Sequence, residues 1–205
     1  MRRLLSLVAA IVVTLTLASG AARAAATPEA TIRSFYATLL DAMKKGPALG
    51  ERGRYDMLAP VIRSSFDLRT MAHLAVGLSW AHFSPTEQQQ VTDAFARYTT
   101  ATYADNFSHY SGENFVVTGT RKTPYGTLVN SQIVKSNGEP VSIDYLMRQN
   151  GDDWQIADVY LTGTISQVAN LRAQFSAVLE QQGVQGLVDT LNHKAEMLVA
   201  SSSAP

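Results

Sequence analysis

The stretch Met147–Phe175, MRQNGDDWQIADVYLTGTISQVANLRAQF, decides how this chain folds. Its Asn150-Gly151 pair is among the strongest short signals for a β-hairpin turn. Apolar and polar residues then alternate through Trp154–Leu161, as they do in a half-buried strand. From Ile165 onward the apolar residues recur at helical spacing. The stretch therefore predicts a hairpin, a strand and the start of an amphipathic helix.

A two-residue turn at Asn150-Gly151 would fix the register of this hairpin. It would pair Arg148 with Asp153, which is a favourable cross-strand charge pair. The opposite face would then hold only apolar or aromatic pairs, so the register satisfies both faces of the sheet. The predicted pairs on that face are Met147 with Trp154, Tyr145 with Ile156, and Val141 with Tyr160.

The same register places Asp158 on the apolar face, opposite Ile143. A buried carboxylate without a partner is costly, so a hydrogen-bond donor or a raised pKa is expected. Arg172 and the tyrosine hydroxyls are the candidate partners. The favoured interpretation is a structural anchor, Asp158 with Arg172, that fastens the sheet to the following helix. The alternative is a catalytic base in an apolar cone.

The flanking sequence predicts helices before and after the strands. Three helix starts carry their own signals: Thr27-Pro28, Asp67, and the capping box Ser84–Glu87. Lys44–Pro47 is expected to end the first helix, and Gly183 to separate the last two. The predicted helices cover residues 28–43, 55–62, 68–76, 85–107, 165–182 and 184–198.

The middle of the chain changes to the alternation of β-strands. Hairpin signals at Asn137-Gly138 and Asn150-Gly151 favour an antiparallel meander. Helices followed by strands and again by helices indicate one α+β domain, which we assign to residues 25–200. The Ser-rich residues 201–205 are expected to be a disordered tail. The four predicted strands are Asn114–Thr120, Thr127–Ser136, Val141–Gln149 and Trp154–Leu161.

The N-terminus has the pattern of a secretory signal peptide. Arg2 and Arg3 precede the apolar run Leu4–Ala18, and small residues with A-x-A spacing follow at Ala22–Ala26. The run is shorter than the ~20 apolar residues of a membrane-spanning helix. We therefore predict that residues 1–24 are cleaved and that the mature protein is secreted.

Composition excludes several classes of function. The chain has no cysteine, so disulfides, a lipoprotein anchor and thiolate metal sites are excluded. Its formal net charge is zero, and loss of the arginines at 2, 3 and 23 leaves the mature chain mildly acidic. Nucleic-acid binding usually requires a basic surface, so no nucleic-acid partner is expected. The scattered histidines and the absence of nucleophile or phosphate-binding motifs predict no metal, no cofactor and no enzyme.

The chain resembles the MlaC family of periplasmic lipid carriers, also known as toluene-tolerance or auxiliary transport proteins. The similarity runs in order through the whole mature chain. Within the family, segments Gly46–Gly50, Tyr98–Tyr103 and Asp144–Arg148 are most similar to the hopanoid-associated HpnM branch. The residues that carry the family resemblance are Phe66–Leu68, Met71-Ala72, Val76-Gly77, Trp80, Pro85–Gln90, Phe95, Tyr103, Trp154–Ile156, Asp158-Val159, Gly163, Ser166, Arg172, Phe175, Gly183 and Gly186-Leu187.

The resemblance implies a curved four-stranded antiparallel sheet wrapped by helices around an apolar cavity, an NTF2-like cone. It implies a monomeric periplasmic carrier that moves phospholipid or hopanoid-type lipid between the inner and outer membranes. Such a carrier would dock transiently at membrane-bound transport complexes. The residues expected to line the cavity are Tyr145, Met147, Trp154, Ile156, Tyr160 and Phe175.

Three alternatives remain open at this point. Each of the lining residues could belong to an ordinary packed core, which is the common place for large apolar side chains. The protein could be an isomerase or hydrolase with Asp158 as base and Tyr145 or Tyr160 as proton donor. It could also be a docking subunit without a cavity.

Overall fold

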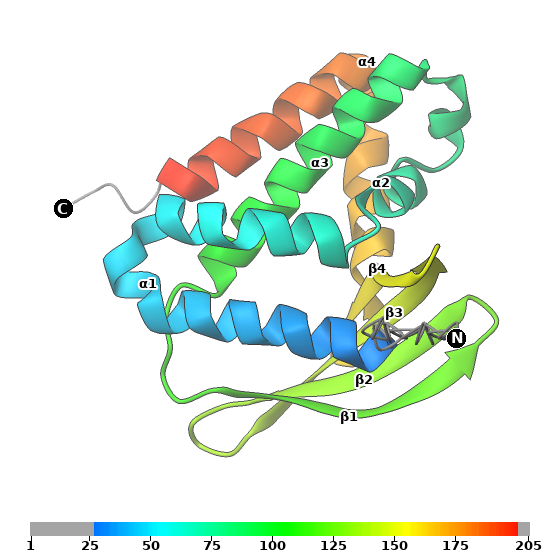
Figure 1. The fold of residues 1–205 in the computed structure, drawn as a ribbon. Helices are drawn as coiled ribbons and strands as arrows, with labels where there is room; N and C mark the ends of the chain where they lie inside the picture. The colour runs from blue at the N-terminus through cyan, green and yellow to red at the C-terminus, as the bar shows by residue number, and fades with distance from the viewer. Residues whose placement is uncertain (1–26, 201–205) are drawn as a thin grey trace, which may run out of the picture.

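The computed structural model describes residues 27–200 (Figure 1). These residues form an α+β fold in which helices lie over one face of an antiparallel sheet. The predicted signal peptide and the predicted Ser-rich tail lie outside the described residues, and both stay predictions.

Helix α1 (Pro28–Ser65) is bent into two arms at Gly50. Thr27 caps its start by accepting a hydrogen bond from the amide of Ala30 at 3.1 Å, as the sequence predicts. The predicted end at Lys44–Pro47 is wrong, since the helix continues past Pro47. The turn comes at Gly50 because its φ of 63° and ψ of −178° belong to a region that is essentially reserved for glycine.

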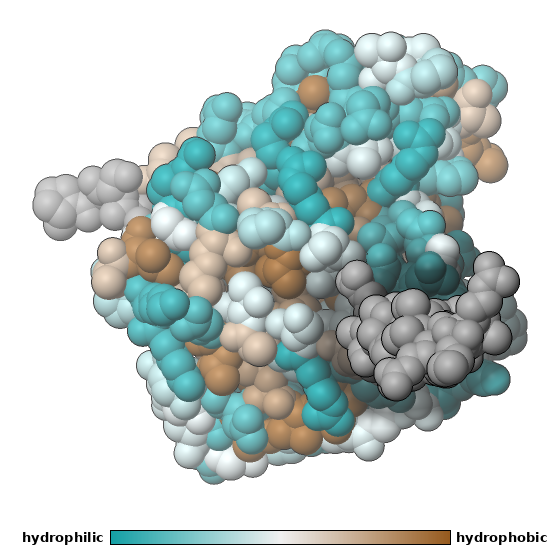
Figure 2. Space-filling model, viewed as in Figure 1, coloured by the Kyte–Doolittle hydropathy of each residue, from teal (hydrophilic) through white to brown (hydrophobic). Residues whose placement is uncertain are grey.

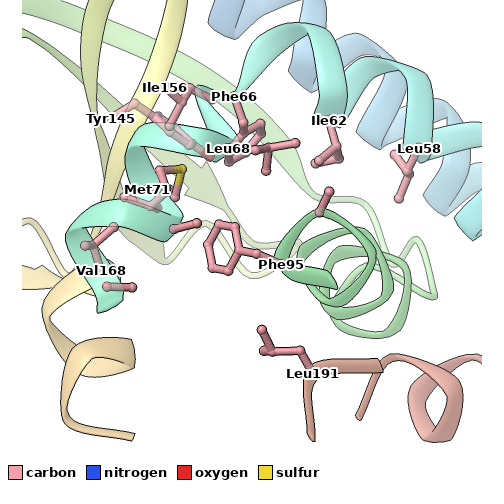
Figure 3. Packing of buried hydrophobic residues seen from close by; sticks show 14 of the residues in the cluster. Leu58, Ile62, Phe66, Leu68, Met71, Phe95, Tyr145, Ile156, Val168 and Leu191 are labelled. Carbon is pink, nitrogen blue, oxygen red and sulfur yellow. The ribbon is translucent and has the colours of Figure 1, made fainter. Parts of the chain in front are cut away.

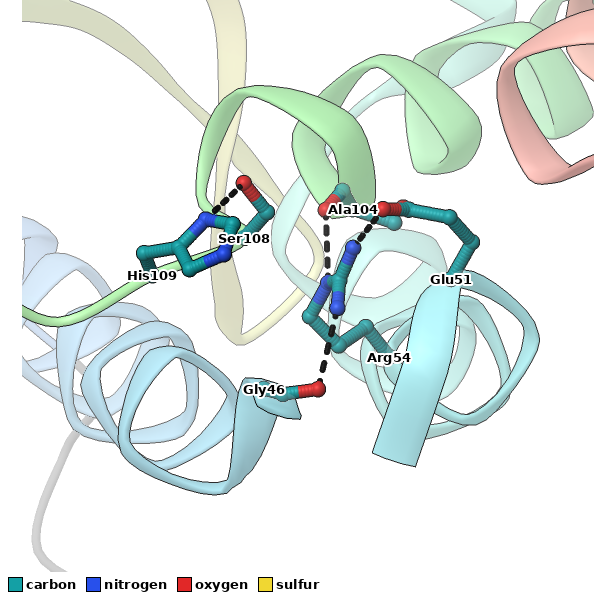
Figure 4. A network of polar contacts seen from close by, with 6 residues as sticks. All are labelled: Gly46, Glu51, Arg54, Ala104, Ser108 and His109. Carbon is teal, nitrogen blue, oxygen red and sulfur yellow. Dashed lines mark hydrogen bonds and ion pairs between the residues drawn. The ribbon is translucent and has the colours of Figure 1, made fainter. Parts of the chain in front are cut away.

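A buried ion pair fixes the bend of α1 (Figure 4). Arg54 pairs with Glu51 and is almost fully buried. Its Nε donates to the carbonyl of Ala104 at 2.9 Å, and its Nη1 donates to the carbonyl of Gly46 at 3.1 Å. One guanidinium therefore holds the end of the first arm of α1 and the last turn of the third helix together. We call this group the Arg54 clamp.

The next three helices form a connected layer. Helix α2 (Leu68–Val76) is capped by Asp67, whose carboxylate accepts from the amide of Thr70 at 3.1 Å. The 3₁₀ helix η1 (Gly77–His82) follows it directly. Helix α3 (Pro85–Asn106) begins at the predicted capping box of Ser84 and Glu87. Both predicted helix starts are confirmed.

The sheet is a meander with strand order β1-β2-β3-β4-β5. The prediction of four strands misses β5, a two-residue strand in which Ile165 pairs with Leu161. The chain turns back on β4 before the last helix begins, so Ile165 belongs to the sheet. The strands are β1 (Asn114–Thr123), β2 (Gly126–Val134), β3 (Pro140–Asn150), β4 (Asp153–Leu161) and β5 (Ile165–Ser166).

The predicted register of the β3–β4 hairpin is wrong. The two turn residues are Gly151 and Asp152, so Asn150 pairs with Asp153. Gly151 has a φ of 61°, and glycine at the first position is the signature of a type II′ hairpin turn. The expected turn residues are Asn150 and Gly151. In the structure Gly151 is the first turn residue, and Asn150 is the last residue of β3.

A β-bulge at Ala157 then changes the face of the sheet to which each later residue of β4 points. Met147 pairs with Ile156, whereas the preceding Leu146 pairs with Asp158. Ala157 is therefore the extra residue, and every residue after it changes sides. Asp158 lies on the face opposite Tyr145, which corrects the prediction that it faces the apolar side.

Helix α4 (Gln167–Ala200) completes the helical layer and is bent at Gly183, where φ is 67° and ψ is −169°. The predicted break at Gly183 is thus confirmed. Figure 3 shows the core, with Phe95 of α3 pointing toward Phe66 and Met71, and Leu191 of α4 closing the far side. The helices and one face of the sheet enclose this core.

Candidate functional site

A pocket of about 220 Å³ lies between α3 and the inner face of the sheet. None of the residues that line it carries a charged side chain. The first wall is one face of α3: Phe95, Tyr98, Thr99, Thr102, Tyr103 and Asn106, with Phe107 just beyond. The facing wall is Ile143 and Tyr145 of β3 with Val159 and Leu161 of β4. Phe66, Met71, Gln167 and Leu171 close the ends.

The α3 wall is set by helical spacing. Residues three and four positions apart project from the same side of a helix, so Phe95, Thr99 and Thr102 follow one another along the pocket. Tyr103 is held in place by ring contacts. It stacks on Phe107 with centroids 5.7 Å apart and meets Phe66 edge to face at 5.6 Å. This part of the wall is therefore a cluster of aromatic rings in mutual contact.

Phenol groups from α1, α3 and β3 lie close together on one side of the pocket. Ser131 donates its hydroxyl proton to the carbonyl of Ile143, so Tyr36 must be the donor in its 2.6 Å hydrogen bond with Ser131. Burial raises the pKa of Tyr103 and of Tyr145, and each phenol lies near enough to affect the other. Both therefore stay neutral at physiological pH, so the pocket remains uncharged.

Two partly exposed apolar residues lie at or beside the pocket. Leu161 lines it and is still 39% exposed, and its partner across the β4–β5 turn, Ile165, is 48% exposed. The turn between them is tight, with positive φ at Thr162 and Gly163. An apolar ligand that entered beside them would contact apolar side chains at the surface as well as inside the pocket.

Only one of the six residues predicted to line a cavity lies in the pocket wall. That residue is Tyr145. Met147, Ile156 and Phe175 are buried in the core cluster instead. Trp154 is partly buried against the same cluster.

Tyr160 is placed differently from the other five predicted lining residues. It pairs with Asp144 on the opposite face of the sheet, which corrects its predicted position and follows from the bulge at Ala157. Its pKa is raised, first by burial and then by the neighbouring carboxylate of Asp158.

Sequence reasoning missed the α3 wall. Phe95, Tyr98 and Thr102 recur at helical spacing, but that pattern is the same for a packed core and for a pocket. The signal that could have drawn attention is the mixture of aromatic and hydroxyl residues along the stripe.

Asp158 joins β4 to the first turn of α4. Its carboxylate accepts hydrogen bonds from the amide of Val168 at 3.1 Å, from the hydroxyl of Ser166 at 2.6 Å and from its neighbour's amide. A carboxylate at a helix N-terminus is also favoured by the helix dipole. With these donors, and outside the pocket wall, Asp158 is poorly placed to act as a base on a bound ligand.

Arg172 does not pair with Asp158, which differs from the predicted anchor. Its guanidinium lies against Gly77 at the end of α2, where a Cβ atom would come within 3.0 Å of Nε. Because Asp158 lies beyond the bulge, its hydrogen bonds come from backbone and hydroxyl donors of the β5–α4 junction and not from Arg172.

Metal chemistry finds no support in the part of the chain that is described. Among residues 27–200 there is no group of three His, Cys, Asp or Glu side chains able to hold a metal ion. None of the helices in the same range combines the length and the apolar character needed to cross a membrane.

The fold and the site define a class: an α+β domain whose helical layer and antiparallel sheet border a pocket without charged lining residues. The sequence profile of the family "MlaC protein" matches residues 33–193, most of the chain, and the chain belongs to the MlaC family. The comparison does not distinguish the HpnM branch within it.

A solved structure has the same fold. It is that of the phospholipid-binding protein from Ralstonia solanacearum in complex with a phospholipid. The TM-score is 0.73 at 24% identity, and the match covers 84% of this chain and 99% of the other. No curated protein sequence shows significant similarity to this chain.

Proposed function

We propose that this protein is a periplasmic lipid carrier that binds the hydrocarbon of a phospholipid or hopanoid-type lipid and moves it between the inner and outer membranes. The observation that carries the proposal is the pocket between α3 and the sheet, whose lining has no charged residue. Membership of the MlaC family and the likeness to a phospholipid-binding protein support it.

The physics of lipid transfer explains why such a pocket suffices. Each buried methylene is worth about 0.8 kcal/mol, so a lipid chain does not leave a membrane for water at a useful rate. A pocket lined by aromatic and aliphatic side chains replaces the bilayer interior during transfer. No catalytic group is needed, because the cargo is released unchanged.

The size of the pocket implies that it widens when cargo enters. Its volume of about 220 Å³ is below the roughly 300–1,000 Å³ of typical small-molecule sites. Part of one hydrocarbon chain would fit without movement, and a whole lipid would not. We expect the seam between α3 and β4 to open, because the pocket already separates the two there.

The cargo and the partners follow from the same proposal. A carrier of this kind would act as a monomer that docks transiently at membrane-bound transport complexes. The uncharged lining selects for hydrocarbon, and the opening beside Leu161 leaves a polar headgroup near water. Phospholipid and hopanoid-type lipid both meet that requirement.

The test is lipid extraction from protein purified from its native host, followed by mass spectrometry. Thr102→Trp places an indole in the pocket and should abolish the co-purifying lipid. Gln89→Trp adds the same side chain to the exposed part of α3 and should leave the lipid bound. Native protein without extractable lipid, and without exchange from labelled vesicles, would rule out the carrier function.

A further inference from the structure

The outer surface of α2 and η1 exposes leucine to an unusual degree. Leu78 of η1 is 93% exposed, and Leu74 of α2, four residues earlier, is also exposed. Figure 2 shows hydrophobic atoms projecting at the upper right, where Figure 1 places the segment that follows α2. Apolar side chains that project in this way often mark an interaction site.

The same surface carries positive charge without acidic neighbours in sequence. No Asp or Glu occurs among residues 68–83 or among residues 159–179. Arg69, His73 and His82 lie in the first segment, and Arg172 lies in the second. We call Arg69, His73, Leu74, Leu78 and Arg172 the α2–η1 patch.

Four acidic side chains bound these two segments in sequence; three of them are occupied elsewhere, and Glu180 is exposed on α4, eight residues beyond Arg172. Asp67 caps α2, Glu87 caps α3, and Asp158 is buried with its own donors. The patch is therefore locally cationic on a chain whose formal net charge is zero.

The polar side chains of the patch are held by packing. Arg69 lies over the ring of Trp80 at 5.6 Å and donates to Gln88 at 2.6 Å. His73 also stacks on Trp80, with centroids 5.3 Å apart. Within residues 27–200 neither Arg69 nor Arg172 forms an ion pair with a carboxylate. Their guanidinium groups thus remain available to an external anion.

The patch and the pocket share two helices. Met71 of α2 and Leu171 of α4 line the pocket, and Arg172 follows Leu171 directly. The patch therefore lies on the outside of the helices that close one end of the pocket. A contact made here would hold the carrier with its pocket close to the contacted surface.

We propose that the α2–η1 patch docks the protein on the anionic phospholipid surface of a membrane. Leu78 enters the headgroup layer, and Arg69 and Arg172 contact lipid phosphates. A bilayer surface offers anionic groups above hydrocarbon, which matches cations that flank a projecting leucine. This proposal rests on the patch and is independent of what the pocket carries.

Flotation of the purified mature protein with vesicles tests the proposal. Binding is expected to vesicles of phosphatidylcholine mixed with phosphatidylglycerol, weaker binding to phosphatidylcholine alone, and loss of binding at high salt. Leu78→Asp should weaken binding about tenfold, since one leucine no longer inserts. Arg172→Gln should weaken it about fivefold, as expected for one cation near an anionic surface.

Matched controls lie at the other end of the molecule, near the bend of α1 and the end of α4 (Figure 1). Met197→Asp replaces a residue that is 57% exposed, and Arg52→Gln removes an exposed cation. Both should leave vesicle binding unchanged. Because Leu78 is exposed, its substitution leaves the fold intact, which circular dichroism checks.

Two results would overturn the docking proposal: no flotation with mixed vesicles, or equal flotation of Leu78→Asp and Met197→Asp. Either result, in a protein that still yields lipid on extraction, removes the docking site and leaves the carrier function standing. Flotation that depends on Leu78, in a protein with neither extractable lipid nor exchange from labelled vesicles, supports the docking site and rules out the carrier.

Discussion

The two sides of α3 are built in opposite ways. At the Arg54 clamp, buried charge and two helix carbonyls tie its last turns to the bend of α1. At the seam with β4, the same helix faces the sheet across an uncharged pocket. α3 packs mainly on other helices, and the strands pack mainly on one another. Because α3 is tied to the other helices more tightly than to the sheet, we expect the seam to open first when cargo enters.

Breaking the clamp should produce the largest effect. Arg54→Ala removes the cation beside Glu51 and leaves the carbonyls of Gly46 and Ala104 without their donor. Loss of one partner of a buried ion pair costs about 3–5 kcal/mol, so the free energy of unfolding in urea should fall by that amount.

The matched control for the clamp is Arg52→Ala, which removes an exposed arginine paired with Asp56. Exposed ion pairs are worth about 0–1 kcal/mol, so its unfolding curve should nearly overlay the native one. Similar losses in the two variants would mean that the clamp does not stabilise the bend.

Asp158→Asn tests the junction at which the start of α4 is joined to β4. The amide side chain still accepts hydrogen bonds but loses the charge that strengthens them and favours the helix N-terminus. We expect a loss of about 1–2 kcal/mol in urea unfolding, with lipid content unchanged.

Asp189→Asn is the control for Asp158, because Asp189 lies on α4 and accepts a hydrogen bond from Gln185 near the surface. Its stability should stay close to native. Unchanged stability of Asp158→Asn together with loss of a chemical turnover would instead favour the enzyme hypothesis.

High pH should lower the free energy of unfolding by a small amount, through the tyrosines beside the pocket. Burial raises the pKa of Tyr103 and Tyr145, so the folded state keeps protons that the unfolded state releases above its ordinary tyrosine pKa. Their contribution to stability is complete below that pKa and is lost as pH rises above it. At half a pH unit above the ordinary tyrosine pKa of about 10, each of these two tyrosines should lower the free energy of unfolding by about 0.8 kcal/mol.

Tyr145→Phe should remove one such contribution, so its urea midpoint should fall less between pH 8 and pH 10.5 than that of the native protein. Tyr125→Phe changes an exposed tyrosine and should follow the native pH dependence. An equal pH dependence in all three proteins would show that the phenol at 145 ionises freely.

The sequence predicts the starts of α1, α2 and α3 well, because helix caps depend on local chemistry. Thr27, Asp67 and Ser84 cap helices by side-chain hydrogen bonds to residues three positions away. Gly183 likewise breaks α4 through its own backbone conformation. Such signals can be recognised in a short window of residues.

The sheet and the pocket were harder to predict, because they depend on relations that the alternation of residue types does not encode. The choice of Gly151-Asp152 as the turn shifts the hairpin by two residues, and the bulge at Ala157 shifts it again. Whether Tyr145 meets a pocket and Met147 a packed core depends on how closely the helices approach each residue.

The bulge at Ala157 has one further consequence. With unbroken alternation along β4, Asp158 and Tyr160 would point inward beside Tyr145. A single additional backbone unit turns both outward, so the bulge keeps the carboxylate of Asp158 out of the pocket lining. A mutation that deletes or inserts one residue in β4 would therefore alter cargo selection even if every side chain named here were preserved.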